Sequence, residues 1–251
     1  SIVAKAKQQK VSVVSYDRLV SGPADVYISY QNEQVGKLQG EALLKALAGA
    51  GAGAKPTIVM INGDPTDPNA AQFKKGAHSA LNGKVTIGAE YDTPTWSNDK
   101  AQQEMQAAIT KLGKSKIQGV YAANDGTAGG AIAAMKSAGF TKIPPTTGQD
   151  AELAGIQRIV AGDQYMTVYK ATKIEAEGAA QAAYDLLQGK KPSGTTTTIN
   201  NGTANIPSIV LTPVAVTKDK IKDTVIKDGY WKATDICTGS FAKACTSLGI
   251  S

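Results

Sequence analysis

The sequence predicts an α/β protein of two lobes, each built on a mostly parallel sheet that is flanked by helices. The first observation is a repeat of apolar runs that have the length of a buried strand, end in Asn or Asp and precede a helical pattern. These runs occupy residues 11–18, 57–69, 119–130 and 143–155. Alternation of strand and helix favours a parallel sheet. The second observation is the length of 251 residues, which exceeds one typical domain and favours two.

The other elements follow in order along the chain. A second extended segment, residues 26–30, comes after the first run, and residues 32–49 carry apolar side chains at helical spacing. Further helices are expected to begin near Ala70, Asn98, Thr127, Ala151 and Lys173. Glycine commonly follows the last turn of a helix, because it adopts the left-handed backbone freely. Several of these helices are expected to end at Gly83, Gly113, Gly139, Gly162 and Gly189.

Composition excludes several classes of protein. With 42% hydrophobic and 19% charged residues, the chain can bury real cores and does not have a disordered composition. It contains no run of 18 apolar residues, so no transmembrane helix is expected. The net charge of +6 comes almost entirely from scattered Lys, and the only Arg residues are Arg18 and Arg158. Without a basic run interleaved with aromatics, nucleic-acid binding is not expected.

The first residues resemble the last turns of a helix rather than a native start, and no signal peptide is visible. We therefore expect a processed or truncated chain. The two cysteines, Cys237 and Cys245, favour a local disulfide, because a metal site needs more ligands and the only histidine, His78, is far away in sequence. A disulfide indicates an oxidising, extracytoplasmic compartment.

The polar ends of the four runs carry the functional argument. Carboxyl ends of parallel strands open onto a common crevice, where ligands bind. Asn and Asp there provide hydrogen-bond donors and acceptors but few nucleophiles or metal ligands, a chemistry that suits holding a polyhydroxylated small molecule. His78 has no partner in a catalytic spacing, and no GxSxG, HExxH or P-loop motif is present. We expect neither an enzyme nor a cofactor.

Seven ordered strings identify a family. The chain resembles the periplasmic sugar-binding proteins of bacterial ABC importers, of the ribose- and galactose-binding type and especially their xylose-binding members, in VVSYDR, ISYQNEQVG, DPNAAQFKKG, AANDGTAGGAI, TGQDAELAGIQRI, YMTVYKAT and TVIKDGYWK. The resemblance covers residues 1–232 and leaves out the tail with both cysteines. It implies the family's fold, in which three crossing segments join two lobes and the sugar lies between them.

The resemblance also implies boundaries. The implied segments are 1–30 with 171–207 for the first lobe, 31–166 with 209–251 for the second, and crossings near 29–33, 165–170 and 208–213. Family members begin with additional strands and helices before the segment that matches Ser1, so the first lobe is expected to be truncated. Three alternatives stay open: the missing part has been cut off, it is a separate polypeptide, or the chain packs differently from its relatives.

By resemblance, the sugar contacts are Asp17, Arg18, Asn69, Trp96, Asn124, Asp150 and Lys170. A carboxylate and a guanidinium at one strand end can bind neighbouring hydroxyls, although an ion pair between Asp17 and Arg18 is the alternative. An indole fits the C–H face of a sugar ring, and ordinary core packing is the alternative for Trp96. Lys170 would follow a strand at a crossing segment.

Helix capping is the alternative for the remaining three contacts, Asn69, Asn124 and Asp150. We expect Asp125 to cap the helix that follows it rather than to contact sugar. Arg158 is expected to be structural, and Trp231 to pack near the C-terminus.

The resemblance implies a solute-binding protein that captures a monosaccharide, most of all the pentose D-xylose, by hinge closure. Its closed form would dock on the membrane permease of an ABC importer. The expected location is periplasmic or extracellular, with a lipid anchor at the cell surface as a further option. A sugar-sensing module of a signalling or transcription-regulatory protein is the alternative, because the same fold serves such roles.

Overall fold

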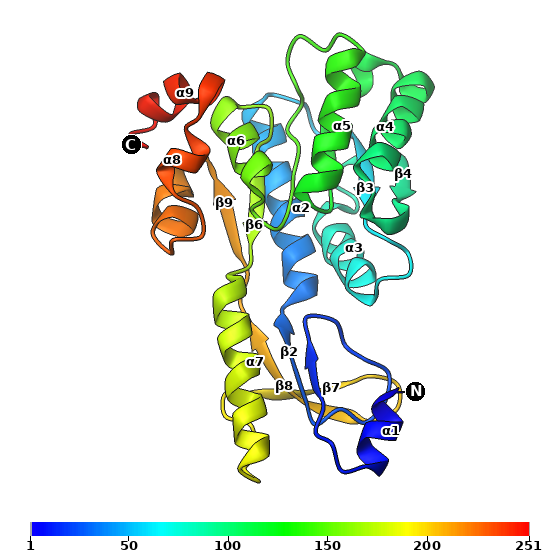
Figure 1. The fold of residues 1–251 in the computed structure, drawn as a ribbon. Coiled ribbons are helices and arrows are strands. Elements are labelled where there is room, and N and C mark those ends of the chain that lie inside the picture. Colours follow the sequence, from blue (N-terminus) through cyan, green and yellow to red (C-terminus); the bar gives the residue numbers. More distant parts are fainter. Residues whose placement is uncertain (1, 251) are drawn as a thin grey trace. The chain divides into compact units, whose positions relative to one another are not determined.

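The computed structural model describes residues 2–250 and divides the chain into two compact units. Unit 1 comprises Ser1–Asn32 and Lys170–Pro213, and unit 2 comprises Glu33–Tyr169 and Val214–Ser251. The colours of Figure 1 show that each unit is assembled from segments distant in sequence. The second segment of unit 1 extends past residue 207, where the first lobe was expected to end, because residue 207 lies inside a strand, Asn205–Leu211, that pairs within unit 1.

Unit 1 is built on a four-stranded sheet of order β1-β2-β8-β7. Its strands are β1 (Val14–Tyr16), β2 (Val26–Tyr30), β7 (Thr197–Asn200) and β8 (Asn205–Leu211). Strand β2 is parallel to both β1 and β8, whereas β7 is antiparallel to β8. The small helix α1 (Ile2–Gln8) precedes the sheet. Helix α7 (Thr172–Leu187) packs Ala182 against Val26 and Ile28 of β2.

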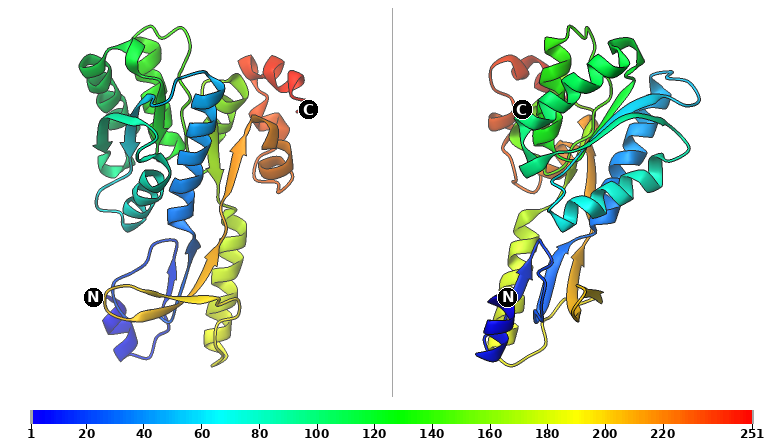
Figure 2. Two further views of the ribbon diagram at one scale, coloured as in Figure 1. Left: turned by 180° about the vertical axis from the view of Figure 1, so that it is seen from behind. Right: turned by 90° about the vertical axis from the view of Figure 1, so that its right-hand side faces the viewer.

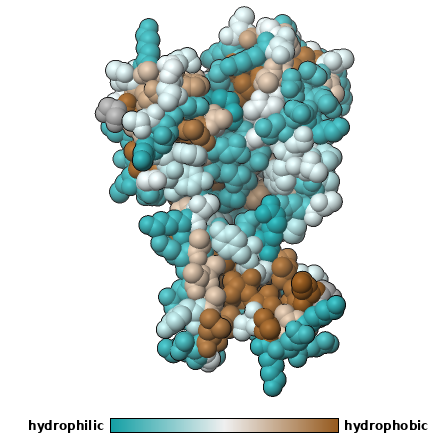
Figure 3. Space-filling model, in the orientation of Figure 1, coloured by the Kyte–Doolittle hydropathy of each residue, from teal (hydrophilic) through white to brown (hydrophobic). Residues whose placement is uncertain are grey.

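Unit 1 leaves apolar surface and the outer edge of β1 uncovered. Strand β1 pairs only with β2, so its other edge has no strand partner among the described residues. The exposed large hydrophobic side chains of this unit are Ile2, Val11, Tyr16, Ile174, Tyr184 and Leu187. Figure 3 shows hydrophobic (brown) surface over much of unit 1. Open edges and large apolar patches are normally covered in a complete domain, so unit 1 has the surface of a truncated lobe.

Unit 2 contains a three-stranded parallel sheet of order β4-β3-β5. The strands are β3 (Thr57–Asn62), β4 (Thr86–Asp92) and β5 (Gly119–Ala122). Figure 2 shows helices on both faces of this sheet: α2 (Asn32–Gly49) and α3 (Pro68–Leu81) on one, α4 (Asn98–Leu112) and α5 (Asp125–Ser137) on the other. Val59 and Ile61 face the second pair of helices, and Ile58 and Met60 face the first. Burial of alternate side chains on both faces explains why β3 is apolar from Ile58 to Ile61.

A second layer of unit 2 joins the C-terminal segment to the middle of the chain. Strand β6 (Met166–Tyr169) is antiparallel to β9 (Val214–Thr217), and helix α6 (Leu153–Ala161) precedes β6. Beyond β9 lie the short turns η3 (Lys218–Lys220) and η4 (Lys222–Ile226) and then α8 (Ala233–Ile236), η5 (Gly239–Phe241) and α9 (Ala242–Ser247). Cys237 and Cys245 form a disulfide within this tail. No helix in residues 2–250 is long and apolar enough to cross a membrane.

The fold contains most of the strands and helix ends that the sequence predicts. Three of the four polar-ended runs contain strands, namely β1, β3 and β5. The fourth is wrong as a strand: beside β5 it forms a single bridge, between Thr146 and Val120. Pro144 and Pro145 lack the N–H donors that a continuous ladder requires. All five glycines expected to end helices have positive φ, from 67° to 91°.

Helices α2 and α3 cross at two glycines, which sets how closely they approach. A Cβ atom on Gly36 would lie 1.8 Å from the carbonyl oxygen of Phe73, and one on Gly76 would lie 1.9 Å from that of Glu33. Neither position can accept a side chain unless the helices move apart.

We expect Gly36→Ala to destabilise the chain by about 1–3 kcal/mol, the usual cost of overpacking a close contact. Gly49→Ala is the matched control, because Gly49 belongs to the same helix and a Cβ atom there would have no neighbour within 4 Å. Denaturant unfolding followed by circular dichroism measures both variants. An unchanged unfolding midpoint for Gly36→Ala would show that this crossing is not close.

Candidate functional site

The seven predicted contact residues are divided between the units. Asp17, Arg18 and Lys170 belong to unit 1, and Asn69, Trp96, Asn124 and Asp150 belong to unit 2. Trp96 follows strand β4, and five of the others lie within the polar-ended runs of the sequence analysis, namely Asp17, Arg18, Asn69, Asn124 and Asp150.

Trp96 is held in a fixed orientation by its neighbours in unit 2. Its indole N–H donates to Oδ2 of Asp67 at 3.2 Å, and its ring meets Phe73 edge-on with centroids 6.2 Å apart. Gly63 lies against the ring: a Cβ atom on Gly63 would be only 2.1 Å from the indole carbon Cη2. The side chain is only half-buried, so part of the indole remains accessible to a ligand.

Asn69 is not the cap of helix α3, which was the alternative considered for it. Asp67 is the N-cap and accepts the backbone N–H of Asn69 at 2.9 Å, and Pro68 occupies the first helical turn. Asn69 is 2% exposed. The Asp67 carboxylate therefore joins the start of α3 to the indole of Trp96.

Asn124 is the N-cap of helix α5. Its Oδ1 accepts the backbone N–H of Thr127 at 2.8 Å, while the hydroxyl of Thr127 accepts the backbone N–H of Asn124 at 3.2 Å. This reciprocal arrangement is a capping box. Capping uses the amide oxygen, and the same side chain also carries two N–H donors that suit sugar hydroxyls.

The expectation that Asp125 caps α5 is wrong. Asp125 is fully buried, and its Oδ1 accepts from Nε2 of Gln164 at 2.6 Å. Its Oδ2 accepts the Thr167 hydroxyl at 3.0 Å and the backbone N–H of Glu152 at 2.9 Å. Burial raises the pKa of Asp125 to about 8, which these donors oppose. The carboxyl group thus points away from the helix end and into the layer formed by β6.

In unit 1, Asp17 and Arg18 form the ion pair that was their alternative. Nη1 of Arg18 lies 2.7 Å from Oδ2 of Asp17, and the Arg18 side chain is 56% exposed. The hydroxyl of Tyr27 donates to the carbonyl oxygen of Asp17 at 3.0 Å. Exposed ion pairs contribute at most about 1 kcal/mol to stability, so this pair is a weak structural element.

Glu175 is a nearby acidic residue that the sequence did not single out. It lies in the first turn of α7, is 4% exposed, and interacts with Tyr16, Asp17 and Lys170 of unit 1. Burial, together with the negative charge of Asp17, raises the pKa of Glu175 to about 7, while Lys170 opposes the shift. The sequence could have indicated Glu175, because this acidic residue lies five positions after the predicted contact Lys170.

Unusual backbone conformations gather at the predicted contacts. Among the described residues, the non-glycine residues with positive φ are Lys10, Asp17, Thr95, Trp96, Asp150 and Ala151. Three of these six are predicted contact residues, and Thr95 and Ala151 are direct neighbours of two of them. Such conformations cost about 1–3 kcal/mol each and concentrate at functional sites. Left-handed backbone thus occurs at three of the predicted contacts, Asp17, Trp96 and Asp150.

The structure assigns other roles to His78 and Arg158. His78 lies 2.9 Å from Oε1 of Glu90 and 3.0 Å from Oδ1 of Asn82. Burial disfavours its charged form, but these two hydrogen bonds outweigh burial and raise the pKa of His78. Arg158 donates to the carbonyl oxygen of Asp125 at 2.6 Å, a structural contact as expected. In residues 2–250, no cluster of His, Cys, Asp or Glu is arranged to hold a metal ion.

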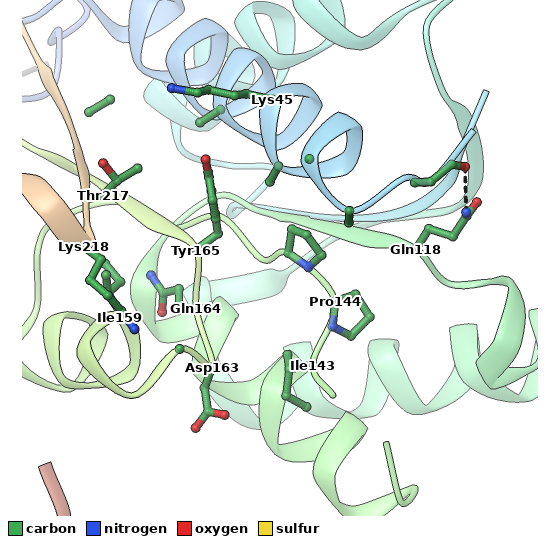
Figure 4. Close-up of a pocket in the computed structure, with 18 of the residues that line it drawn as sticks. Lys45, Gln118, Ile143, Pro144, Ile159, Asp163, Gln164, Tyr165, Thr217 and Lys218 are labelled. Carbon is green, nitrogen blue, oxygen red and sulfur yellow. Dashed lines mark hydrogen bonds between the residues drawn. The ribbon is translucent and has the colours of Figure 1, made fainter. Parts of the chain in front are cut away.

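A cavity of about 1230 Å³ lies at the opposite edge of the unit 2 strands (Figure 4). Its lining includes Gln118, which precedes β5, Tyr165, which precedes β6, and the end of β9 at Thr217. None of the seven predicted contact residues lines it. Ligands of open α/β sheets bind outside the carboxyl ends of the strands, so volume alone does not make this cavity the site.

Comparisons with known proteins agree with this fold. The family model described as a periplasmic binding protein domain matches residues 1–191. The chain is 40% identical to the D-xylose-binding periplasmic protein of Escherichia coli K12, with 94% of this chain and 71% of that protein covered. It is 37% identical to the protein of the same name from Haemophilus influenzae, with 92% and 69% covered.

Solved structures give the same result. An ABC transporter solute binding protein from Clostridium phytofermentans with bound β-D-glucose is 28% identical, with a TM-score of 0.85 and coverage of 94% of this chain and 78% of that one. A carbohydrate transporter solute binding protein from Chloroflexus aurantiacus in complex with D-glucose has a TM-score of 0.82 at 28% identity, with 93% and 76% covered. The relatives are longer than this chain, which agrees with the truncated surface of unit 1. The chain belongs to the periplasmic binding protein family.

Proposed function

We propose that this chain is the sugar-binding component of an ABC importer and that its ligand is a monosaccharide, in particular D-xylose. The observation that carries the proposal is the 40% identity to the D-xylose-binding periplasmic protein of E. coli over 94% of this chain. The left-handed backbone at Asp17, Trp96 and Asp150 supports the choice of contact residues. The relatives reported above are named as binding proteins, so no observation favours an enzyme or the sensor alternative.

The contact residues suit a sugar because they combine one aromatic face with several polar groups. The indole of Trp96 would bury the C–H face of the ring, while Asn124 and Asp150 would bind hydroxyl groups. Asp17, Arg18, Asn69 and Lys170 would complete the set. Hydrogen bonds to charged groups contribute about 1.5–3 kcal/mol each, and a sugar that lacks one hydroxyl leaves its buried partner unpaired. Selectivity between sugars would follow from that penalty.

Binding would engage residues of both units. The chain passes between the units three times, after Asn32, after Tyr169 and after Pro213, close to the expected crossings. Three short connections suit hinge closure on a ligand, and the closed form would then dock on the membrane permease. The proposal places the protein in the periplasm, the location named for the E. coli and H. influenzae relatives. It does not include a separate polypeptide for the missing part, because these relatives carry the matching region and the remainder in one protein.

D-xylose is expected to bind more tightly than D-ribose, L-arabinose or D-glucose. Because unit 1 is truncated, the titration is made on the two-lobe protein, defined as this chain extended at its amino end to the length of its relatives. Isothermal calorimetry measures each affinity, and a thermal-shift series checks it independently, since a ligand bound only by the folded state raises the unfolding midpoint. A two-lobe protein that responds to none of the four sugars would contradict the proposal.

Arg18→Gln is expected to weaken xylose binding about 10- to 100-fold, which corresponds to the loss of one charge-assisted hydrogen bond, with little change in stability. Lys7→Gln is the matched control. Lys7 forms an exposed ion pair with Asp25 in the same unit, with side-chain exposures of 58% and 21% against 56% and 25% for Arg18 and Asp17. Calorimetry on both variants separates the two roles. Equal affinities for Arg18→Gln and Lys7→Gln would remove Arg18 from the site.

A further inference from the structure

Asp150–Ala151 is one of two adjacent left-handed pairs in unit 2. Its φ angles are 88° and 50°, and neither residue is glycine. Asp150 is half-buried, whereas Ala151 is completely buried. Two adjacent residues in this region store strain that the surrounding structure must offset.

Hydrogen bonds hold the N–H groups of this turn. The backbone N–H of Asp150 donates to the carbonyl oxygen of Val168 at 2.8 Å. The N–H of Ala151 donates to the hydroxyl oxygen of Thr167 at 3.1 Å, and that hydroxyl donates onward to Asp125. The same Asp125 carboxylate accepts the next N–H, that of Glu152. Three successive N–H groups are thus bound, two of them through the buried pair of Asp125 and Thr167.

The carbonyl groups of the turn are held from the opposite direction by the C-terminal segment. The indole N–H of Trp231 donates to the carbonyl oxygen of Ala151 at 2.8 Å. The hydroxyl of Tyr230 lies 3.4 Å from the carbonyl oxygen of Asp150. Tyr230 is itself packed edge-on between Trp231 and Tyr169. The segment expected only to pack therefore makes specific bonds to the turn.

We propose that Asp125, Thr167 and Trp231 form a clamp that keeps Asp150–Ala151 left-handed, and that they are positioning residues for the sugar contact made by Asp150. The inference rests on the proposed function, because it assigns these residues to the same site. None of the three need touch the sugar. They act on binding through the backbone that carries Asp150.

The clamp explains why a carboxyl group is buried at the start of α5. Its two oxygens accept three hydrogen bonds here, whereas the amide of asparagine, which has the same size, offers only one acceptor oxygen. Here one group joins three partners from separate segments: the loop after Asp150, strand β6 through Thr167, and Gln164. Loss of any one partner would leave a buried polar group unpaired and release part of the turn.

Thr167→Val tests the clamp, because valine keeps the shape of threonine and removes the hydroxyl that joins Ala151 to Asp125. Thr146→Val is the matched control: Thr146 is also completely buried in unit 2, and its hydroxyl donates to the carbonyl oxygen of Pro144 at 2.9 Å, away from the turn. Trp231→Phe is a second variant, which keeps an aromatic ring and removes the N–H donor. D-xylose affinity is measured by calorimetry on the two-lobe protein, and amide hydrogen exchange is measured on the same samples without sugar.

We expect Thr167→Val to weaken xylose binding about tenfold and Trp231→Phe about threefold, which corresponds to the loss of part of one charge-assisted hydrogen bond. Thr146→Val should lower the unfolding midpoint and leave the affinity within about twofold. The amides of Ala151 and Glu152 should exchange at least about tenfold faster in Thr167→Val than in Thr146→Val.

Equal affinities for Thr167→Val and Thr146→Val would overturn the positioning role. If the parent two-lobe protein binds no sugar, the proposed function fails, and hydrogen exchange alone decides the clamp. Unchanged exchange at Ala151 and Glu152 in Thr167→Val would then overturn it.

Discussion

The candidate site depends on left-handed backbone at non-glycine residues in two turns of unit 2. Two adjacent pairs in unit 2, Thr95–Trp96 and Asp150–Ala151, adopt it, and each pair includes a predicted sugar contact. An L-residue pays a steric cost in this region because its Cβ crowds the backbone. The pairs persist because hydrogen bonds from neighbouring groups offset this steric cost. The geometry of the site therefore depends on those neighbours.

Each of the two turns is held by an aspartate that follows a strand of the central sheet. Asp64, two residues after β3, accepts the backbone N–H of Thr95, and the hydrogen bonds from Thr66 and Thr95 lower its pKa. Asp125, shortly after β5, holds the turn at Asp150. A carboxyl group suits both places because its two oxygens can bind a turn and further partners at once, Thr66 in the case of Asp64 and both Gln164 and Thr167 in the case of Asp125. The polar strand ends therefore serve two purposes: some would face the ligand, and others fix the backbone that presents it.

The sequence predicts best those features that local chemistry decides. The glycines that end helices, the helix starts and three of the polar-ended strands all depend on neighbours in sequence, and all were found. The prediction of a fourth strand was wrong, although the sequence contains Pro144 next to Pro145, a pair that argues against a continuous strand. Asp125 was assigned to the wrong role because its partner Thr167 lies 42 residues away, and the bond from Trp231 to Ala151 spans 80 residues. Only tertiary structure shows that these segments meet.

We propose that sugar is held at the polar strand ends and not in the cavity at the opposite edge of unit 2. A crystal structure of the two-lobe protein grown with D-xylose tests this most directly. We expect electron density for the sugar against the indole of Trp96. A sugar hydroxyl group should be bound by Asp150, and the φ angle of Asp150 should remain positive. Density in the cavity beside Tyr165 and Lys218, with the strand ends empty, would contradict it.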